Sequence, residues 1–266
     1  MTETGAISTG IHQWLEARKL SPDEVASKTL EIKESVLRES QYLDTENFSD
    51  IGPDDLQRLF DQYDHLFFEN NCRQSLGGNP LGFRLSQRMT RSGGKTSRRE
   101  IRNFIGKVVS KEYEIAVSET LLFQAFEGNH RPVVICGIEC ENRLEALQRI
   151  MEHEITHLVE LLIWSKSSCS ATRFQSIANR FFGHTHHRHH LITPREHAFT
   201  KYGIKTGDKV SFQFEGRDYT GLVNRITKRA TVLVEDKHGE PYINGKRYRK
   251  FYIPIEMLES IGKGGS

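Results

Sequence analysis

The chain has 266 residues, of which 36% are apolar and 27% are charged, and these proportions exclude a disordered polypeptide. No stretch approaches the ~20 consecutive apolar residues of a membrane span, and residues 1–10 lack the basic and apolar regions of a secretion signal. The 4 cysteines are too few and too scattered for a disulfide framework at this length. We therefore expect a folded cytoplasmic protein with no membrane partner.

The net charge of +2 is unevenly distributed along the chain. Residues 1–52 carry 5 basic and 10 acidic side chains, residues 53–199 carry 19 and 17, and residues 200–266 carry 13 and 8. The three segments thus have net charges of −5, +2 and +5, so the near-neutral total does not exclude a nucleic-acid partner. Together with changes in sequence pattern, this predicts an acidic helical arm (1–51), a central domain (52–199) and a small β-barrel (200–266).

The acidic arm is expected to be largely helical. Ser21 precedes Pro22 and two acidic residues, a pattern typical of a helix N-terminus. Residues 43–52 are polar and predict a linker. The arm is interpreted either as a docking element or as a solvated appendage.

The central domain predicts a mixture of helices and strands. Apolar residues at helical spacing predict a helix over 53–70. Short apolar or alternating runs predict strands at 82–86, 103–109 and 113–118. Residues 141–164 have no Gly or Pro and are apolar on both faces, which is typical of a buried helix. A second helix is expected after a turn, from a cap at Ser170 to an end at Gly183.

The last segment changes from helical to alternating periodicity. Apolar residues alternate at 210–214 and at 230–234, with glycines between the runs. Four or five short strands in about 60 residues suggest a small closed barrel, closest to an SH3-like one. The fold class predicted for the whole chain is α+β.

His153, Glu154 and His157 form the pattern HExxH in the middle of the buried helix. A spacing of four residues puts both imidazoles on one helix face, where they can share one zinc ion. Glu154 lies beside them, where a carboxylate can take a proton from a metal-bound water as the catalytic general base. The alternative is a pair of hydrogen-bonded core histidines.

A catalytic zinc site needs a third protein ligand. Glu160 is seven residues from His153, about 10 Å along a helix, so it is expected to orient a ligand imidazole rather than bind the ion. An antiparallel return of the second helix brings His184 level with His153, which makes His184 the first choice. The alternatives are Cys169 at the turn, then His187 or His189.

Several segments resemble the SprT-like metalloproteases, which include the Spartan proteases that cleave proteins crosslinked to DNA. The resemblance lies in residues 86–90 followed by Gly94, in residues 113–122, and in the helix with the HExxH pattern. It covers about residues 53–190 and implies a zincin-type fold, zinc bound through His153 and His157, and Glu154 as general base.

The sequence departs from this family where the family's third histidine begins the second helix. Residues 168–170 hold Cys169 there and no histidine, so position within the family favours Cys169 as the third ligand. Residues 95–111 and the C-terminal barrel are further departures.

Basic residues gather in two regions that could contact a phosphate backbone. Residues 84–111 contain nine basic side chains and one acidic one, and form either a basic loop or a solvated hairpin. Residues 91–96 lack the spacing of a phosphate-binding loop, so no nucleotide cofactor is expected. In the barrel, cations alternate with aromatic residues over 246–252. The candidate nucleic-acid contacts are Arg88, Arg91, Lys95, Arg98, Arg99, Arg225, Lys228, Arg229, Arg247, Arg249 and Lys250.

The sequence therefore predicts a zinc metalloendopeptidase of SprT-like type that acts on protein substrates, with DNA as a further candidate partner. The alternative is a nucleic-acid-binding protein with a structural zinc site and no hydrolytic activity. A third interpretation is an adaptor whose arm and barrel recruit partner proteins.

Overall fold

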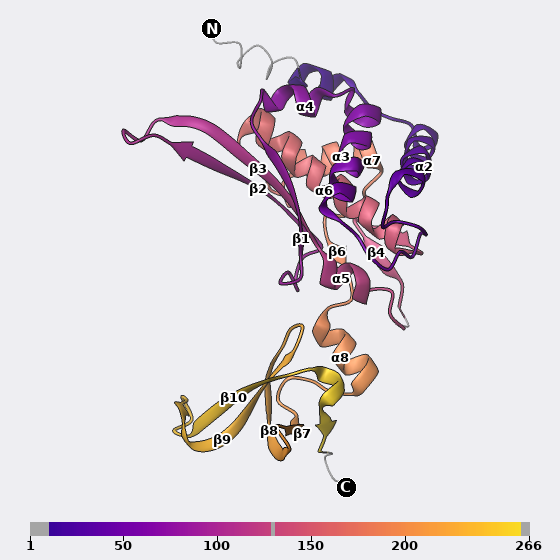
Figure 1. Ribbon diagram of the computed structural model, residues 1–266. Coiled ribbons are helices and arrows are strands. Elements are labelled where there is room, and N and C mark those ends of the chain that lie inside the picture. The colour runs from indigo at the N-terminus through magenta and orange to yellow at the C-terminus, as the bar shows by residue number, and fades with distance from the viewer. Residues whose placement is uncertain (1–10, 129–130, 262–266) are drawn as a thin grey trace. The chain divides into compact units, whose positions relative to one another are not determined.

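The computed structural model describes residues 11–128 and 131–261 (Figure 1). The fold is mixed α+β, as the sequence predicts. The chain divides into two compact units, one made of residues 1–126 and 130–191 and the other of residues 127–129 and 192–266. Within the described residues, no helix is both long and apolar enough to cross a membrane.

The N-terminal arm belongs to the first unit. Residues 11–17 are helical, and α2 (Pro22–Glu39) begins with the expected cap, in which Ser21 and Glu24 bond to each other's backbone N–H groups. The predicted linker at 43–52 contains no helix or strand, but two of its apolar residues, Leu43 and Phe48, are fully buried. The arm is therefore part of the packed core rather than a solvated appendage.

The helical layer of the first unit surrounds α6 (Arg143–Trp164). Around it lie α3 (Pro53–Phe68), α4 (Asn71–Leu76), α5 (Glu119–Gln124) and α7 (Thr172–Phe182). Phe67, Phe68, Phe181 and Phe182 are buried where α3 meets α7, each burial contributing about 2 kcal/mol. The buried helix and the returning helix ended by Gly183 agree with the sequence prediction. The predicted cap at Ser170 is wrong, because the N-cap of α7 is Ala171, which makes no side-chain cap hydrogen bond.

A three-stranded sheet packs beside α6, with strand order β1-β3-β2. Its strands are β1 (Leu81–Ser86), β2 (Gly94–Arg102) and β3 (Val108–Ser118). β1 is parallel to β3, and β2 is the antiparallel edge strand. Most of the basic segment at 84–111 thus forms the long β2–β3 hairpin, which extends from the rest of the sheet in Figure 1.

The strand predicted at 103–109 is wrong over residues 103–107, which form the turn of the β2–β3 hairpin. The side-chain oxygen of Asn103 accepts hydrogen bonds from the N–H groups of Ile105 and Lys107, at 3.2 and 2.9 Å. Gly106 has φ +80°, which an extended strand does not adopt. Local side-chain bonding by Asn103 therefore outweighs the apolar pattern of the segment.

A second small sheet of the first unit has the order β5-β4-β6. It consists of β4 (Val133–Ile135), β5 (Ile138–Cys140) and β6 (His189–His190). β4 pairs antiparallel with both neighbours. This sheet brings residues on either side of the α6–α7 hairpin together.

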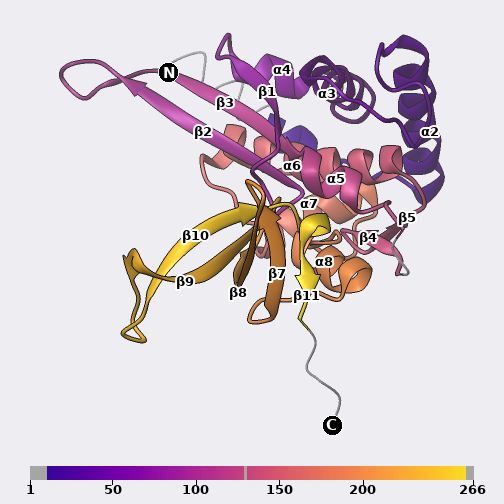
Figure 2. The same ribbon diagram turned by 60° about the horizontal axis from the view of Figure 1, so that its bottom comes forward.

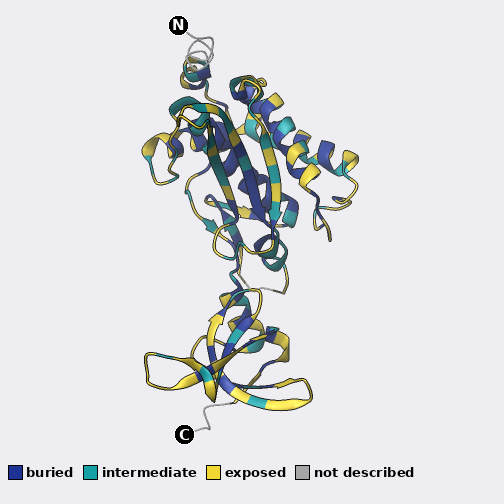
Figure 3. Ribbon diagram, turned by 60° about the vertical axis from the view of Figure 1, so that its left-hand side comes forward, coloured by how far each residue is buried: buried dark blue, intermediate teal, exposed yellow. Residues whose placement is uncertain are grey.

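The second unit is a five-stranded antiparallel sheet with the order β10-β9-β8-β7-β11 (Figure 2). The elements are α8 (Pro194–Tyr202), β7 (Lys209–Phe214), β8 (Arg217–Ile226), β9 (Ala230–Pro241), β10 (Arg247–Ile253), η1 (Ile255–Met257) and β11 (Glu259–Ser260). Ala198 of α8 is fully buried in the core of this unit, so the unit begins before the predicted boundary at residue 200. The outer end of the β9–β10 hairpin is exposed (Figure 3).

Candidate metal centre

His153 and His157 lie one turn apart on α6, with ring centroids separated by 4.9 Å. Phe174 of α7 packs against both rings, at centroid distances of 4.8 and 4.5 Å. Burial lowers the pKa of His153 far below its ordinary value and lowers the pKa of His157 to about 4. Both imidazoles are therefore neutral near pH 7, which is the form that binds metal ions.

The orientation of the His157 ring is fixed by a chain of side chains. Nδ1 of His157 lies 2.6 Å from the Ser167 hydroxyl oxygen, which in turn lies 2.6 Å from a carboxylate oxygen of Glu160. The second carboxylate oxygen of Glu160 accepts a 2.6 Å hydrogen bond from Arg173. Glu160 thus reaches His157 through Ser167 and leaves Nε2 of that ring to face an ion.

Glu154 is buried beside the two histidines and is held by β2. The Thr96 hydroxyl lies 2.7 Å from Oε2 of Glu154 and 2.9 Å from its backbone oxygen. Burial raises the pKa of Glu154 to about 8, and the hydrogen bonds from Thr96 oppose part of that rise. A Cβ atom at Gly94 would lie 2.5 Å from Oε1 of Glu154, so only glycine allows this close approach. Glu154 is therefore placed and tuned as a group that can accept a proton near neutral pH.

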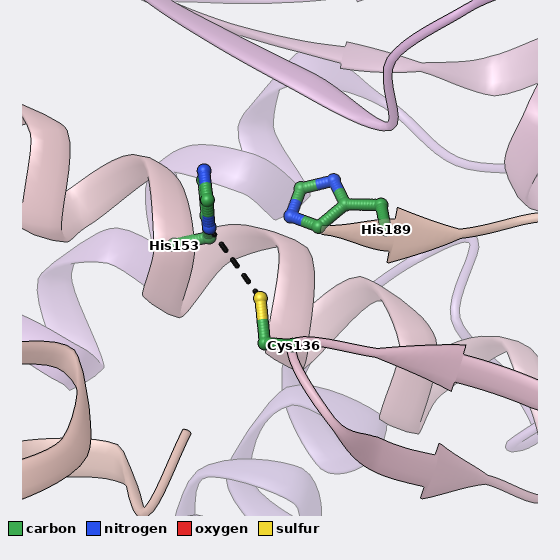
Figure 4. Close-up of side chains that lie close together, drawn as sticks. All are labelled: Cys136, His153 and His189. Carbon is green, nitrogen blue, oxygen red and sulfur yellow. Dashed lines mark hydrogen bonds between the residues drawn. The ribbon is translucent and has the colours of Figure 1, made fainter. Parts of the chain in front are cut away.

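Two groups of side chains bring three potential ligand atoms within 4.8 Å of one another. One group is His153, His157 and Cys169, and the other is Cys136, His153 and His189 (Figure 4). Cys169 and His189 were both alternatives for the third ligand, and the structure brings each of them beside His153. The two groups share His153.

Cys136 is a site residue that the sequence analysis missed. It forms the turn between β4 and β5 together with Gly137, and both residues have positive φ angles, +54° and +84°. Asn-Gly or Asp-Gly is usual in such a two-residue hairpin turn. In the sequence, Cys136 and Gly137 stand between two short apolar runs, where a hairpin turn is expected. That pattern was the signal that could have indicated Cys136 as a site residue.

His184, the first choice for the third ligand, lies in neither group. Its Nε2 atom is 2.8 Å from a carboxylate oxygen of Glu152, which is fully buried. Glu152 also bonds to Tyr63 at 2.8 Å and to Arg149 at 2.9 Å. The helix hairpin returns as predicted, but it places His184 against this buried carboxylate rather than beside His153 and His157. His187 lines the cavity of the candidate site, and its Nδ1 atom lies 3.3 Å from Gln175.

A cavity of about 460 Å³ opens over His153, Glu154 and His157. Arg91 and Lys95 also line it, so two of the predicted nucleic-acid contacts lie beside the candidate metal ligands.

The other predicted nucleic-acid contacts divide between the two units. Arg88 is exposed, while Arg98 and Arg99 pair with Glu100 and Glu112 at 3.2 and 4.0 Å. The contacts predicted in the second unit are all exposed, namely Arg225, Lys228, Arg229, Arg247, Arg249 and Lys250. Lys250 pairs with Glu240. These six residues belong to the second unit, whereas the candidate metal centre belongs to the first.

The residues present suit a metal ion of intermediate softness. Nε2 of His189 is buried and has no hydrogen-bond partner within the described part of the chain. A buried polar atom without a partner is costly, and a metal ion would satisfy it. Imidazole nitrogens and thiolate sulfurs are the ligands that zinc takes in proteins.

Comparison with known proteins gives no match to a protein-family model, to a curated protein or to a solved structure.

Proposed function

We propose that the chain is a zinc-dependent endopeptidase of SprT-like type. The observation that carries the proposal is the pairing of two neutral imidazoles, His153 and His157, with the buried carboxyl group of Glu154 on one turn of α6. His153 and His157 would bind the zinc ion, together with Cys169 or His189. Zinc bound there would supply a Lewis acid that polarises a peptide carbonyl and acidifies water.

The chain's own residues would carry the proton transfers. A carboxyl group with a pKa of about 8 is mostly protonated at pH 7, with about one-tenth in the ionised form, and is half-ionised near pH 8, so Glu154 can both accept a proton and return it to the leaving amine. Thr96 stabilises the ionised form of Glu154 and holds its carboxylate toward the cavity. Ser167 and Glu160 keep the His157 ring in one orientation.

Two features of the fold support the domains that we propose, a zincin-type domain in the first unit and an SH3-like barrel in the second. α6 packs beside the mixed sheet, whose edge strand β2 lines the candidate cavity, so a substrate backbone can approach next to Glu154. In the second unit, β7 pairs with both β8 and β11, and one 3₁₀ turn precedes β11, which supports an SH3-like barrel.

Metal analysis and proteolysis test the proposal. The purified chain is expected to contain one zinc ion and to cleave an unfolded protein such as reduced casein. Glu154→Gln should keep the metal and lose at least about a hundredfold in activity, because it removes the proton acceptor. Glu139→Gln, an exposed glutamate on β5, is the matched control and should be fully active. Activity that survives Glu154→Gln, or a wild-type chain without metal, contradicts the proposal.

A second candidate is a nucleic-acid-binding protein in which the zinc is structural. The observation that favours it is the number of potential donors, since His153 with Cys136, His157, Cys169 and His189 makes five, more than the four that close a structural site. X-ray absorption separates the two functions, because four protein ligands indicate a structural ion and three with a water indicate a catalytic one.

The DNA partner has its own test on the second unit. Replacing Arg225, Arg229 and Arg249 by alanine should weaken binding of duplex DNA and reduce the salt dependence of log K by about 3. Replacing the exposed Lys205, Lys209 and Lys237 is the control for lost charge alone. If both sets of replacements weaken DNA binding equally, DNA does not bind specifically at Arg225, Arg229 and Arg249.

A further inference from the structure

Cys136 lies outside the HExxH pattern, yet its sulfur faces the first histidine of that pattern. Sγ of Cys136 is 3.4 Å from Nδ1 of His153 (Figure 4). A tetrahedral zinc ion bonded at about 2.3 Å to sulfur and about 2.0 Å to nitrogen holds two such ligand atoms about 3.5 Å apart. The observed separation is therefore the one expected of two ligands of a single ion.

His189 supplies a third donor on the same side of His153. The two rings have centroids 4.4 Å apart, and the ligand atoms of Cys136, His153 and His189 all lie within 4.8 Å of one another. Nε2 of His189 is buried and lacks a hydrogen-bond partner within the residues that the structure describes. An ion between the three side chains would satisfy that nitrogen.

The backbone holds Cys136 and His189 in place before any ion binds. Ile135 pairs with His189 across β4 and β6, and the N–H of Cys136 donates to the carbonyl oxygen of Arg188 at 2.9 Å. A Cβ atom at Gly93 would lie 2.8 Å from Nδ1 of His189, so the glycine backbone closes directly against the ring. Neither donor needs a chain rearrangement to reach the ion.

The conformation of Cys136 is also unfavourable for its residue type. Its φ angle of +54° is left-handed, which costs a residue with a side chain about 1 kcal/mol relative to glycine. Backbone strain of this kind is concentrated at functional sites. The carbonyl oxygen of Cys136 accepts hydrogen bonds from the N–H groups of Thr185 and His186, at 3.0 and 3.1 Å, which help to hold the strained residue.

We propose that Cys136, His153 and His189 form a second metal position for zinc or another thiophilic divalent ion. It lies beside the position formed by His153, His157 and Cys169. The two positions share His153. The proposal goes beyond peptide hydrolysis and does not require Glu154.

Cobalt(II) is the probe for the test, because it replaces zinc in nitrogen and sulfur sites and its bond to thiolate gives a near-ultraviolet charge-transfer band. The background is the full chain with Cys169→Ser, which removes the thiol of the other group. We expect this chain to show the cobalt–thiolate band. Adding Cys136→Ser should abolish the band and weaken cobalt binding more than about tenfold.

Cys140→Ser is the matched control in the same background, because Cys140 is a buried thiol that lies in neither group. It should leave the band unchanged. A Cys169→Ser chain without the band, or a band that survives Cys136→Ser, overturns the proposal.

A second variant keeps the proposal testable if Cys136→Ser does not fold. His189→Gln, also in the Cys169→Ser background, should lower cobalt affinity by a similar factor, and unchanged affinity overturns the proposal. Glu154→Gln should leave the cobalt band as it is. Because the cobalt band does not depend on Glu154, failure of the peptidase test and failure of this proposal can be told apart.

Discussion

The hydroxyl group of Thr96 on β2 lies 2.7 Å from Oε2 of Glu154 on α6, which joins the edge strand of the sheet to the helix that carries both histidines. Thr96 is exposed enough to meet a ligand, whereas Glu154 is buried. A side chain of the edge strand therefore tunes the carboxyl group that the proposed reaction uses.

Thr96→Val is expected to raise the pKa of Glu154 further. The hydrogen bond from Thr96 stabilises the ionised carboxylate, so its loss should move the pKa from about 8 to about one pH unit higher. Titration of the Glu154 side-chain carbon by NMR in the metal-free chain measures this change. Thr96→Ser keeps the hydroxyl and should titrate like the wild type. Equal pKa values for Thr96→Val and wild type would show that the bond does not act on Glu154.

Ser167→Ala is expected to weaken metal binding by about tenfold. The serine links Nδ1 of His157 to Glu160, and without it the ring loses the contact that fixes its orientation. Competition with a chelator measures the zinc affinity. Ser168→Ala is the matched control, because the hydroxyl of Ser168 contacts Ser170 rather than a histidine. Equal affinities of the two variants would contradict the role given to Ser167.

His184→Gln is expected to lower stability without changing metal content. His184 bonds to the buried carboxylate of Glu152, so its replacement should cost about 2 kcal/mol of unfolding free energy. Tyr63→Phe, which removes another donor to Glu152, should cost a similar amount. Urea unfolding and metal analysis measure the two quantities. Loss of bound metal in His184→Gln would restore His184 as a ligand.

Acidification is expected to destabilise the metal-free chain. Burial, followed by the neighbouring imidazoles, lowers the pKa of His189 from 6.5 to about 3. The folded state then binds fewer protons than the unfolded state, so this stability is present above pH 6.5 and is lost as the pH falls toward 3. The metal-free chain should therefore be less stable at pH 5 than at pH 7.5.

Urea unfolding at pH 7.5 and at pH 5 checks this expectation, with a chelator present. The wild type should lose about 1 to 2 kcal/mol more than His189→Gln between the two values, because the variant has no imidazole to protonate at that position. Identical losses in the two chains would contradict the low pKa of His189.

The elements that the sequence predicted correctly are those whose pattern is local. The cap at Ser21, the buried helix with His153 and His157, and the returning helix that ends at Gly183 all follow from spacing within one helix. The HExxH group is local in the same sense, because a four-residue spacing places two side chains on one helix face wherever the helix lies.

The errors arise where a local pattern competes with distant packing. Residues 43–52 are polar on average, yet Leu43 and Phe48 pack into the core formed by later helices. Likewise, the apolar residues at 104–105 are exposed, because Asn103 and Gly106 turn the chain there. Composition averages over a segment, whereas burial is decided residue by residue.

By itself the sequence determined the α+β class, the buried helix and the pair of histidines with Glu154 between them. Only the tertiary structure decided which further side chains meet that pair. A helix-hairpin argument favoured His184, but the small β5-β4-β6 sheet brings Cys136, which precedes α6, and His189, which follows α7, to His153. The physical reason is that a metal site is defined by ligand atoms a few ångströms apart in space, and strand pairing between distant segments sets that separation.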